Sequence, residues 1–344
     1  MKNKIIMLVS VFLSLIIVPV AALDFSQFSF DTAKSVFASA NGSSWETTQS
    51  TALSDDKAKA DEETEVKVMA SASGNILSMT ELEYIIGCVA SEVPATYHEE
   101  ALKAQAVAAY TNLIRLKQNP DSSLNGADIS DSPQKHQGYF TKEQRKEKWG
   151  ENFEKYSEKV EKAVKEVAGV VMTYESEPIV ASYCAMCPGR TESAEVIWGT
   201  DIPYLQSISS PGDKLSPDYS STLILTKEQF KEIAEKDKDI KLGDDPEKWI
   251  GKVEYSKNDT GVVKSIQIGS KTLSGNSARM MFSLRSPSFK ASYENSSFTF
   301  EVSGYGHCVG MSQYGADYMA RNGSDYKEIL KHYYQGIAFT RAVG

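Results

Sequence analysis

Glu92 is the acidic residue whose position most favours chemistry. It lies in GCVASEVPATYHEEALKAQAVAAY (residues 87–110), a segment that predicts two helices separated by a proline. At 100° per residue, Glu92 lies about 20° from Ile85 and about 40° from Cys88, on the apolar side of the first helix. Burial and the negative end of the helix dipole both disfavour a carboxylate, so we expect a raised pKa, as a general acid needs. A boundary glutamate turned to solvent is the alternative.

Two further stretches contain reactive side chains. SYCAMCPGRTESAEVIWG (residues 182–199) has Cys184 and Cys187 in a CxxC spacing, which in an exported protein indicates a disulfide, a redox pair or half of a metal site. In GYGHCVGMSQYGA (residues 304–316), glycines surround His307 before a predicted helix. Such a turn is typical of an active-site loop, and a structural bulge with a solvent-facing histidine is the alternative.

Helix-capping residues define the helix that carries Glu92. Thr80 and Glu83 have the spacing of a capping box that begins the first helix, and Pro94 ends it. Thr96 and Glu99 have the same spacing and predict the start of the second helix. The chain therefore presents its candidate acid on the last turn of a helix that a proline terminates.

The rest of the chain mixes helical and strand patterns. Residues 141–168 predict a charged helix, residues 169–184 a hairpin, and residues 248–269 two strands around an Asn-Asp-Thr-Gly turn. Residues 324–334 predict a final helix. We therefore expect an α+β domain of mixed helices and antiparallel strands over residues 65–340.

The N-terminus predicts export. Lys2 and Lys4 precede a largely apolar run that ends at Leu23, so residues 1–23 form a transmembrane anchor or a cleaved signal peptide. Residues 24–64 are rich in Ser, Ala, Thr, Asp and Lys and predict an extracytoplasmic spacer. If the anchor is retained, the protein is a single-pass protein of the cell membrane with its folded domain outside.

Charge and motifs exclude several function classes. The net charge is −9 and the pI about 5.2, whereas nucleic-acid-binding proteins usually show a basic patch. The sequence has no Walker loop, no GxGxxG after a strand and no HExxH, so nucleotide binding and zincin chemistry have no support.

Three segments together resemble the signature blocks of the SpoIID/LytB family. They are YIIGCVASEVPATYHEEALKAQAVAAY (residues 84–110), GRTESAEVIWGTDIPYLQSISSP (residues 189–211) and GHCVGMSQYGA (residues 306–316), in the order and spacing of the family. ADISDSPQKHQGYF (residues 127–140) and ARMMFSLRSPSF (residues 278–289) resemble two weaker blocks. The resemblance covers roughly residues 65–340.

The resemblance implies a peptidoglycan lytic transglycosylase. In that family the glutamate of the "ASE-hydrophobic-P" motif is the catalytic acid and base, which here is Glu92. One carboxylate is enough for this reaction, because the muramyl C6 hydroxyl is the nucleophile and the product is a 1,6-anhydromuramyl end. A hydrolytic glycosidase generally needs a second carboxylate. The resemblance also implies a preference for glycan stripped of stem peptides, in septal wall remodelling and engulfment during sporulation.

The family blocks imply a glycan-binding groove beside Glu92. For each groove residue the alternative is a packing or loop-bracing role, and Arg190 and Glu192 in particular have the alternative of forming an internal ion pair. The expected substrate-binding residues are Lys103, Gln105, Arg190, Glu192, Tyr204, His307 and Gln313.

The cysteines depart from the family pattern. Where family members usually show HSTSGGRTE, this chain has CAMCPGRTE (residues 184–192), so at Cys184 the family usually has a histidine. With that segment counted, Cys88, Cys184, Cys187 and Cys308 all fall in the family blocks. Three alternatives stay open: a Cys184–Cys187 disulfide, a thiolate site for a metal such as zinc with His307 as a further ligand, or four small buried apolar residues. No other cofactor is expected. The cysteine zinc site that some members have near residues 127–140 is absent from this sequence.

Partners follow from the resemblance alone. It implies action on peptidoglycan glycan strands with a SpoIIP-like amidase and a SpoIIM-like membrane protein, and no nucleic-acid partner. The alternative is a non-catalytic, LytB-like amidase enhancer that binds the cell wall. A redox protein using the CxxC pair is a third class, but the sequence lacks a thioredoxin-like βαβ context.

Overall fold

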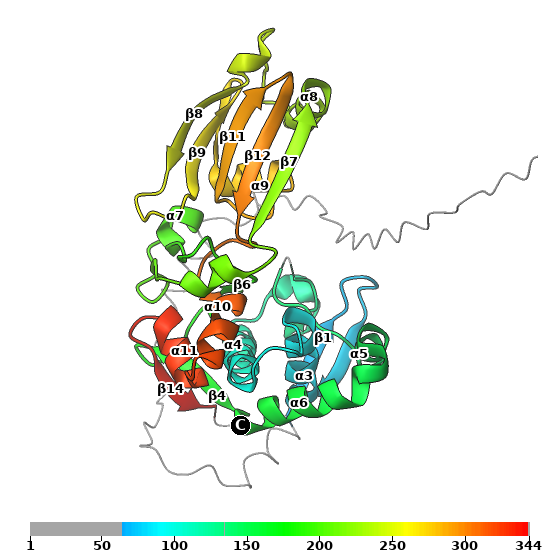
Figure 1. Ribbon diagram of the computed structural model, residues 1–344. Coiled ribbons are helices and arrows are strands. Elements are labelled where there is room, and N and C mark those ends of the chain that lie inside the picture. The colour runs from blue at the N-terminus through cyan, green and yellow to red at the C-terminus, as the bar shows by residue number, and fades with distance from the viewer. Residues whose placement is uncertain (1–63, 134, 343–344) are drawn as a thin grey trace, which may run out of the picture.

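The computed structural model describes residues 64–133 and 135–342, and these form a mixed α+β structure with mostly antiparallel sheets (Figure 1). The predicted anchor or signal peptide (residues 1–23) and nearly all of the predicted spacer lie outside the described residues. Within the described ranges, no helix combines the length and the apolar character that a membrane crossing requires.

Two separate hydrophobic cores divide the described chain. The larger core belongs to a main subdomain, formed by the segments before and after residues 220–303, and the smaller core belongs to residues 220–303, here called the inserted subdomain. Val262 is the residue of the inserted subdomain that packs in the larger core. Figure 1 shows the strands of the inserted subdomain projecting from one end of the main subdomain. The sequence patterns did not anticipate this second core.

Helix α4 lies at the centre of the main subdomain, where it packs against α3, α6, α10, α11 and β4. Five of its alanines are at most 3% exposed, and small side chains let neighbouring helices approach closely on every side. The helices of this subdomain are α3 (Glu81–Glu92), α4 (Glu99–Gln118), α5 (Lys142–Trp149), α6 (Phe153–Glu166), α7 (Ala194–Trp198), α10 (Gln313–Arg321) and α11 (Tyr326–Tyr333), with 3-10 turns η2 (Ser122–Leu124), η3 (Gly150–Asn152) and η4 (Pro211–Leu215).

Three small sheets surround these helices. The strand orders are β2-β1-β3, β14-β4-β5 and β13-β6, and the β1–β3 and β6–β13 pairs are parallel. The strands are β1 (Glu65–Met69), β2 (Ile76–Thr80), β3 (Ile129–Ser130), β4 (Val170–Tyr174), β5 (Glu177–Pro178), β6 (Tyr183–Cys184), β13 (Met311–Ser312) and β14 (Ala338–Arg341). The β6–β13 pair brings the segment just before the block at residues 189–211 beside the block at residues 306–316.

The inserted subdomain has two three-stranded antiparallel sheets, β10-β9-β8 and β11-β12-β7. Its core is aromatic, with Phe230, Trp249 and Phe298 stacked on one another. The elements are β7 (Ser220–Thr226), α8 (Lys227–Ala234), η5 (Pro246–Lys248), β8 (Ile250–Tyr255), β9 (Val263–Ile268), β10 (Lys271–Ser274), α9 (Gly275–Met281), β11 (Phe289–Glu294) and β12 (Ser297–Ser303).

Local patterns predicted the helix that carries Glu92 correctly. The Thr80 hydroxyl accepts a hydrogen bond from the Glu83 N–H at 3.1 Å, and α3 ends two residues before Pro94. The predicted cap at Thr96 is wrong, because His98 is the N-cap of α4. The His98 N–H donates to the Asp317 carboxylate at 2.6 Å, so a contact from α10 fixes where α4 begins.

The charged segment of residues 141–168 is two helices rather than one. Gly150 ends α5 with a φ of +53°, and the turn η3 separates α5 from α6. The predicted hairpin of residues 248–269 is confirmed as the antiparallel pair β8–β9. That of residues 169–184 is confirmed only in part, because β5 is limited to Glu177–Pro178 and Tyr183–Cys184 pairs with β13 instead. Between β4 and β5, Glu175 and Ser176 both have positive φ, as a two-residue hairpin turn requires.

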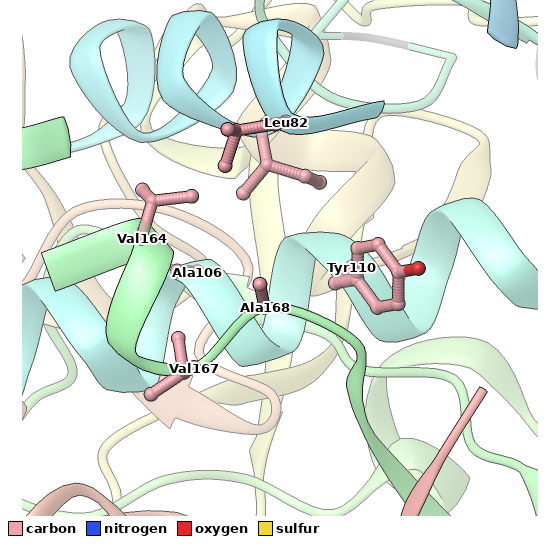
Figure 2. A pocket seen from close by; sticks show the side chains of 7 residues that line it. Leu82, Ala106, Tyr110, Val164, Val167 and Ala168 are labelled. Atoms are coloured by element: carbon pink, nitrogen blue, oxygen red, sulfur yellow. The ribbon is translucent and has the colours of Figure 1, made fainter. Parts of the chain in front are cut away.

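A small apolar cavity lies among α3, α4 and α6 (Figure 2), with a free volume of about 10 Å³. This is at the lower limit for one water molecule, so it is a packing defect rather than a ligand site. Its lining residues are Leu82, Ile85, Ala106, Tyr110, Val164, Val167 and Ala168, and none of the predicted site residues is among them.

Candidate active site

Glu92 is the last residue of α3, and its carboxylate is held from outside the helix. The Gly138 N–H donates to Glu92 Oε1 at 2.5 Å. Burial raises the pKa of Glu92, and the hydrogen bonds from the Gly138 N–H and the Gln313 side chain, with the charge of Lys148, oppose that rise. The net direction is upward, because loss of water disfavours the charged form more than these groups favour it.

Two glutamines extend from Glu92 into the core. Gln313 is the first residue of α10, and besides its bond to Glu92 its Nε2 donates to Gln105 Oε1 at 3.3 Å. Gln105 lies on α4, is completely buried, and its Nε2 has no hydrogen-bond partner in the described part of the chain. Hydrogen bonds thus connect three of the predicted site residues in the order Glu92, Gln313, Gln105.

A buried polar layer lies on the other side of Glu92. The Tyr183 hydroxyl donates to Gln137 Oε1 at 3.2 Å, and Gln137 Nε2 donates to the Tyr84 hydroxyl at 3.0 Å. Burial, followed by the charge of Glu92, raises the pKa of both Cys88 and Tyr183. These side chains are therefore uncharged near neutral pH and make the surroundings of Glu92 less polar than water.

His307 contacts the backbone of Tyr183 in β6, whose hydroxyl belongs to the polar layer described above. Its Nδ1 accepts a hydrogen bond from the Val309 N–H at 3.1 Å, and its ring lies 5.7 Å from that of Trp198. Burial and the nearby charge of Arg279 lower the pKa of His307 to about 4, against a hydrogen bond to the Tyr183 backbone. The imidazole is neutral at physiological pH, and its Nε2 is the nitrogen that carries the proton.

Lys103 and Tyr204 make contacts away from Glu92. Lys103 Nζ is 2.7 Å from Glu100 Oε1 and 2.5 Å from Glu166 Oε2, so it joins α4 to α6. Burial disfavours its charge, but the bonds to the two carboxylates outweigh burial and raise the pKa. Tyr204 is 7% exposed, and its hydroxyl accepts from the Val180 N–H at 3.1 Å.

Arg190 and Glu192 do not pair with each other in the described residues. Arg190 donates from Nε and Nη2 to Ser207 at 3.2 Å. Glu192 is 0% exposed and binds the inserted subdomain: its Oε1 accepts from Asn258 at 2.5 Å and its Oε2 from the Thr260 hydroxyl at 2.6 Å. This carboxylate joins the two subdomains, as the loop-bracing alternative described.

All four cysteines are free and buried. Cys184, Cys187 and Cys308 form a small cluster, in which the thiols of Cys184 and Cys187 share a hydrogen bond of 3.4 Å and form no disulfide. Cys88 packs in the larger core instead, so the four thiols are not gathered into one group. Among the residues that the structure describes, no group of three or more His, Cys, Asp or Glu is arranged to hold a metal ion.

Sequence patterns missed two neighbours of Glu92. Gly138 lies in the weaker block at residues 127–140, where its backbone N–H carried no recognisable signal. Lys148 lies in the uniformly charged sequence KEQRKEKW of α5, which is typical of a solvent-facing helix. Both positions were detectable only once the folded chain placed them beside the end of α3.

Comparison with known proteins agrees with the family blocks. The SpoIID family model, described as "Stage II sporulation protein", matches residues 72–174, a range that includes Glu92. The stage II sporulation protein D of Bacillus subtilis (strain 168) is 37% identical over 278 residues, which are 80% of this chain and 79% of the relative. That of Bacillus amyloliquefaciens is 38% identical over 263 residues, 76% and 74% of the two chains.

A more distant relative is an amidase enhancer, the class that the sequence analysis gave as the alternative function. The amidase enhancer of Bacillus subtilis (strain 168) is 27% identical over 308 residues, which cover 74% of this chain but only 40% of the relative. Identity and coverage are both higher for the two sporulation proteins. Since those matches extend over three quarters or more of the sequence, the chain belongs to the SpoIID family.

Proposed function

We propose that this protein is a peptidoglycan lytic transglycosylase with Glu92 as its acid and base. The observation that carries the proposal is the environment of this one carboxylate. It is partly buried at the end of α3, its pKa is raised by burial, and a backbone N–H and an amide hold it in place. A protonated carboxylic acid at near-neutral pH is what protonation of a glycosidic oxygen requires.

The same residues suit both halves of the reaction. Glu92 first donates its proton to the glycosidic oxygen as the bond to the muramyl C1 breaks. The resulting carboxylate is stabilised by the Gly138 N–H and by Gln313, and it then accepts the proton of the muramyl C6 hydroxyl. As the C6 oxygen bonds to C1, the product is a 1,6-anhydromuramyl end, so no water and no second carboxylate are needed.

The substrate-binding residues divide into two groups under this proposal. Gln313 binds Glu92, Gln105 binds Gln313, and His307 binds the backbone of Tyr183; these three residues are proposed to line the glycan groove. Lys103, Tyr204, Arg190 and Glu192 are proposed to shape the groove indirectly, since their contacts brace helices, loops and the inserted subdomain. Substitutions in the second group should act mainly on stability.

The biological setting is proposed from the family. Two relatives are named stage II sporulation protein D, and we propose that this protein likewise acts in septal wall remodelling and engulfment during sporulation. The predicted apolar N-terminus supports a single-pass anchor with the catalytic domain outside the membrane. A SpoIIP-like amidase, which would supply glycan stripped of stem peptides, and a SpoIIM-like membrane protein are the proposed partners.

The second candidate function is a non-catalytic amidase enhancer. It is favoured by the similarity to the Bacillus subtilis amidase enhancer, which is 27% identical. An enhancer would bind sacculi and stimulate an amidase without cutting glycan, and it would not need a carboxyl group with a raised pKa.

One experiment tests both functions. Full-length protein, purified in detergent, is incubated with amidase-treated sacculi, and the released sugars are examined by mass spectrometry. We expect anhydromuramyl ends from the wild type, at least a 100-fold lower yield from Glu92→Gln, and an unchanged yield from Glu83→Gln, an exposed glutamate on the same helix. Equal yields from Glu92→Gln and wild type would exclude the proposed mechanism, and stimulation of an amidase without anhydro products would favour the enhancer.

A further inference from the structure

Lys148 is a cation beside Glu92 that the proposed chemistry does not use. It lies on α5, and its Nζ is 3.4 Å from the carbonyl oxygen of Ala90, two residues before Glu92 on the last turn of α3. The same ammonium lies 4.5 Å from the centre of the Phe140 ring, just beyond the segment whose Gly138 N–H binds Glu92. Its side chain is thus directed along α3 toward the carboxylate.

The ammonium has no carboxylate partner within 4.0 Å among the residues that the structure describes. Lys103, Lys117 and Lys162, in contrast, each form at least one such ion pair. A carbonyl oxygen and an aromatic face hold Lys148 in place, and neither neutralises its charge. The residue is also exposed, so it has donors free to bind a ligand.

The position of this cation is unfavourable for the acid alone. A positive charge near Glu92 lowers the pKa of the carboxyl group, whereas a general acid needs that pKa to stay high. Although the residue as a whole is exposed, its ammonium lies close to protein atoms, and this partial loss of water lowers the pKa of Lys148, while the charge of Glu92 opposes that effect. A lysine at this position is compatible with a protonated Glu92 if the substrate has an anionic group that pairs with the ammonium and offsets its charge.

The substrate of the proposed reaction has such an anion. The muramyl sugar next to the cleaved bond has a lactyl group on O3, which ends in a carboxylate when it is free and in a neutral amide when it holds a stem peptide. We infer that Lys148 binds the free lactyl carboxylate of the muramyl residue at Glu92 and so determines selectivity for peptide-free glycan. This inference rests on the proposed function.

Binding of the carboxylate also connects recognition to chemistry. Once Lys148 is paired, its charge acts less on Glu92, so the carboxyl group holds its proton more tightly when the correct sugar is bound. With a peptide-bearing sugar the lysine stays unpaired, its charge lowers the pKa of Glu92, and a smaller fraction of Glu92 carries the proton that the reaction needs. Lys148 is therefore a specificity-determining residue, and the proton is still transferred by Glu92 alone.

The test compares two soluble glycan strands of equal length, one with free lactyl carboxylates and one with stem peptides. Full-length wild type, Lys148→Met, Lys148→Arg and the control Lys146→Met, an exposed lysine on the same helix, are assayed for anhydromuramyl ends. We expect Lys148→Met to lower kcat/KM for the carboxylate strand roughly 10- to 100-fold, the range of a hydrogen bond to a charged group, and to change the peptide strand less than about 2-fold. Lys148→Arg should keep the preference and Lys146→Met should behave as wild type.

Two outcomes would overturn the inference. They are an equal loss on both strands, which indicates a structural role or an effect on Glu92 alone, and an unchanged preference in Lys148→Met. If the wild type yields no anhydro products from either strand, it is the proposed function that fails. The role of Lys148 is then tested by measuring equilibrium binding of both strands to Glu92→Gln and to the double variant Glu92→Gln/Lys148→Met. The inference requires Lys148→Met to weaken binding of the carboxylate strand only.

Discussion

The N–H of Gly138 donates a hydrogen bond of 2.5 Å to the carboxylate of Glu92, across 46 residues of sequence. One partner ends an amphipathic helix and the other belongs to an irregular segment between β3 and α5. This bond fixes the direction of the carboxyl group, and it makes the backbone of residues 138–140 part of the candidate site. Glycine fits there without displacing its neighbours, whereas an added Cβ would press on the side chains of Ser91 and Glu92.

Gly138→Ala should reduce catalysis while the fold persists. A Cβ at this position would lie too close to the Ser91 hydroxyl and 3.1 Å from Glu92 Oε1, so the carboxylate must move or lose its donor. We expect kcat to fall at least 10-fold, because a misplaced acid is inefficient even when the displacement is about 1 Å. Anhydromuramyl release and circular dichroism measure the two effects.

Gly243→Ala is the matched control, since a Cβ there meets nothing within 4 Å and its φ is not positive. It should leave kcat unchanged. Full activity of Gly138→Ala would show that the backbone donor does not position the acid.

Glu92→Gln should be more stable than the wild type at alkaline pH. Burial raises the folded-state pKa of Glu92 above its ordinary value, so the folded protein binds this proton more tightly than the unfolded chain does. The resulting stabilisation is fully present below the unfolded pKa and is lost as the pH rises through the folded pKa. The neutral amide of the variant avoids that loss.

Melting temperatures at pH 4, 6 and 8 measure this difference. We expect Tm of Glu92→Gln minus Tm of wild type to increase from pH 4 to pH 8. Asp213, whose pKa burial raises to about 6, is present in both proteins and cancels in the comparison. A difference that stays constant with pH would contradict a raised pKa for Glu92.

Thr260→Val should weaken the connection between the subdomains. The Thr260 hydroxyl donates to the buried carboxylate of Glu192 at 2.6 Å, and the variant leaves that carboxylate with one donor fewer. We expect a loss of about 1–3 kcal/mol in the free energy of unfolding, measured by urea denaturation. Glycan-cleaving activity of the folded fraction should change little.

Thr272→Val in strand β10 is the control, because Thr272 is exposed and should be near neutral. If Thr260→Val instead raises KM with unchanged stability, Glu192 belongs to the substrate-binding surface and is not a brace.

Much of the fold followed from short-range patterns. The Thr80 cap, the β4–β5 turn and the β8–β9 hairpin involve residues a few positions apart, so sequence spacing alone predicts them. The start of α4 could not be predicted in this way, because the Asp317 carboxylate on α10 binds the N–H of His98 and overrides the local signal at Thr96. The second core was also missed, since periodicity shows which side of an element is apolar but not which elements share a core.

The sequence by itself determined the family, the helix that carries Glu92 and the apolar side on which this carboxylate lies, because 3.6-residue periodicity and capping act within one or two helical turns. Only the tertiary structure decided what surrounds it. The Gly138 N–H, Gln313 and Lys148 come from three other segments, and Glu192 turned toward the inserted subdomain. The physical reason is that a pKa depends on burial and on charges a few ångströms away in space, and the folded chain alone sets both.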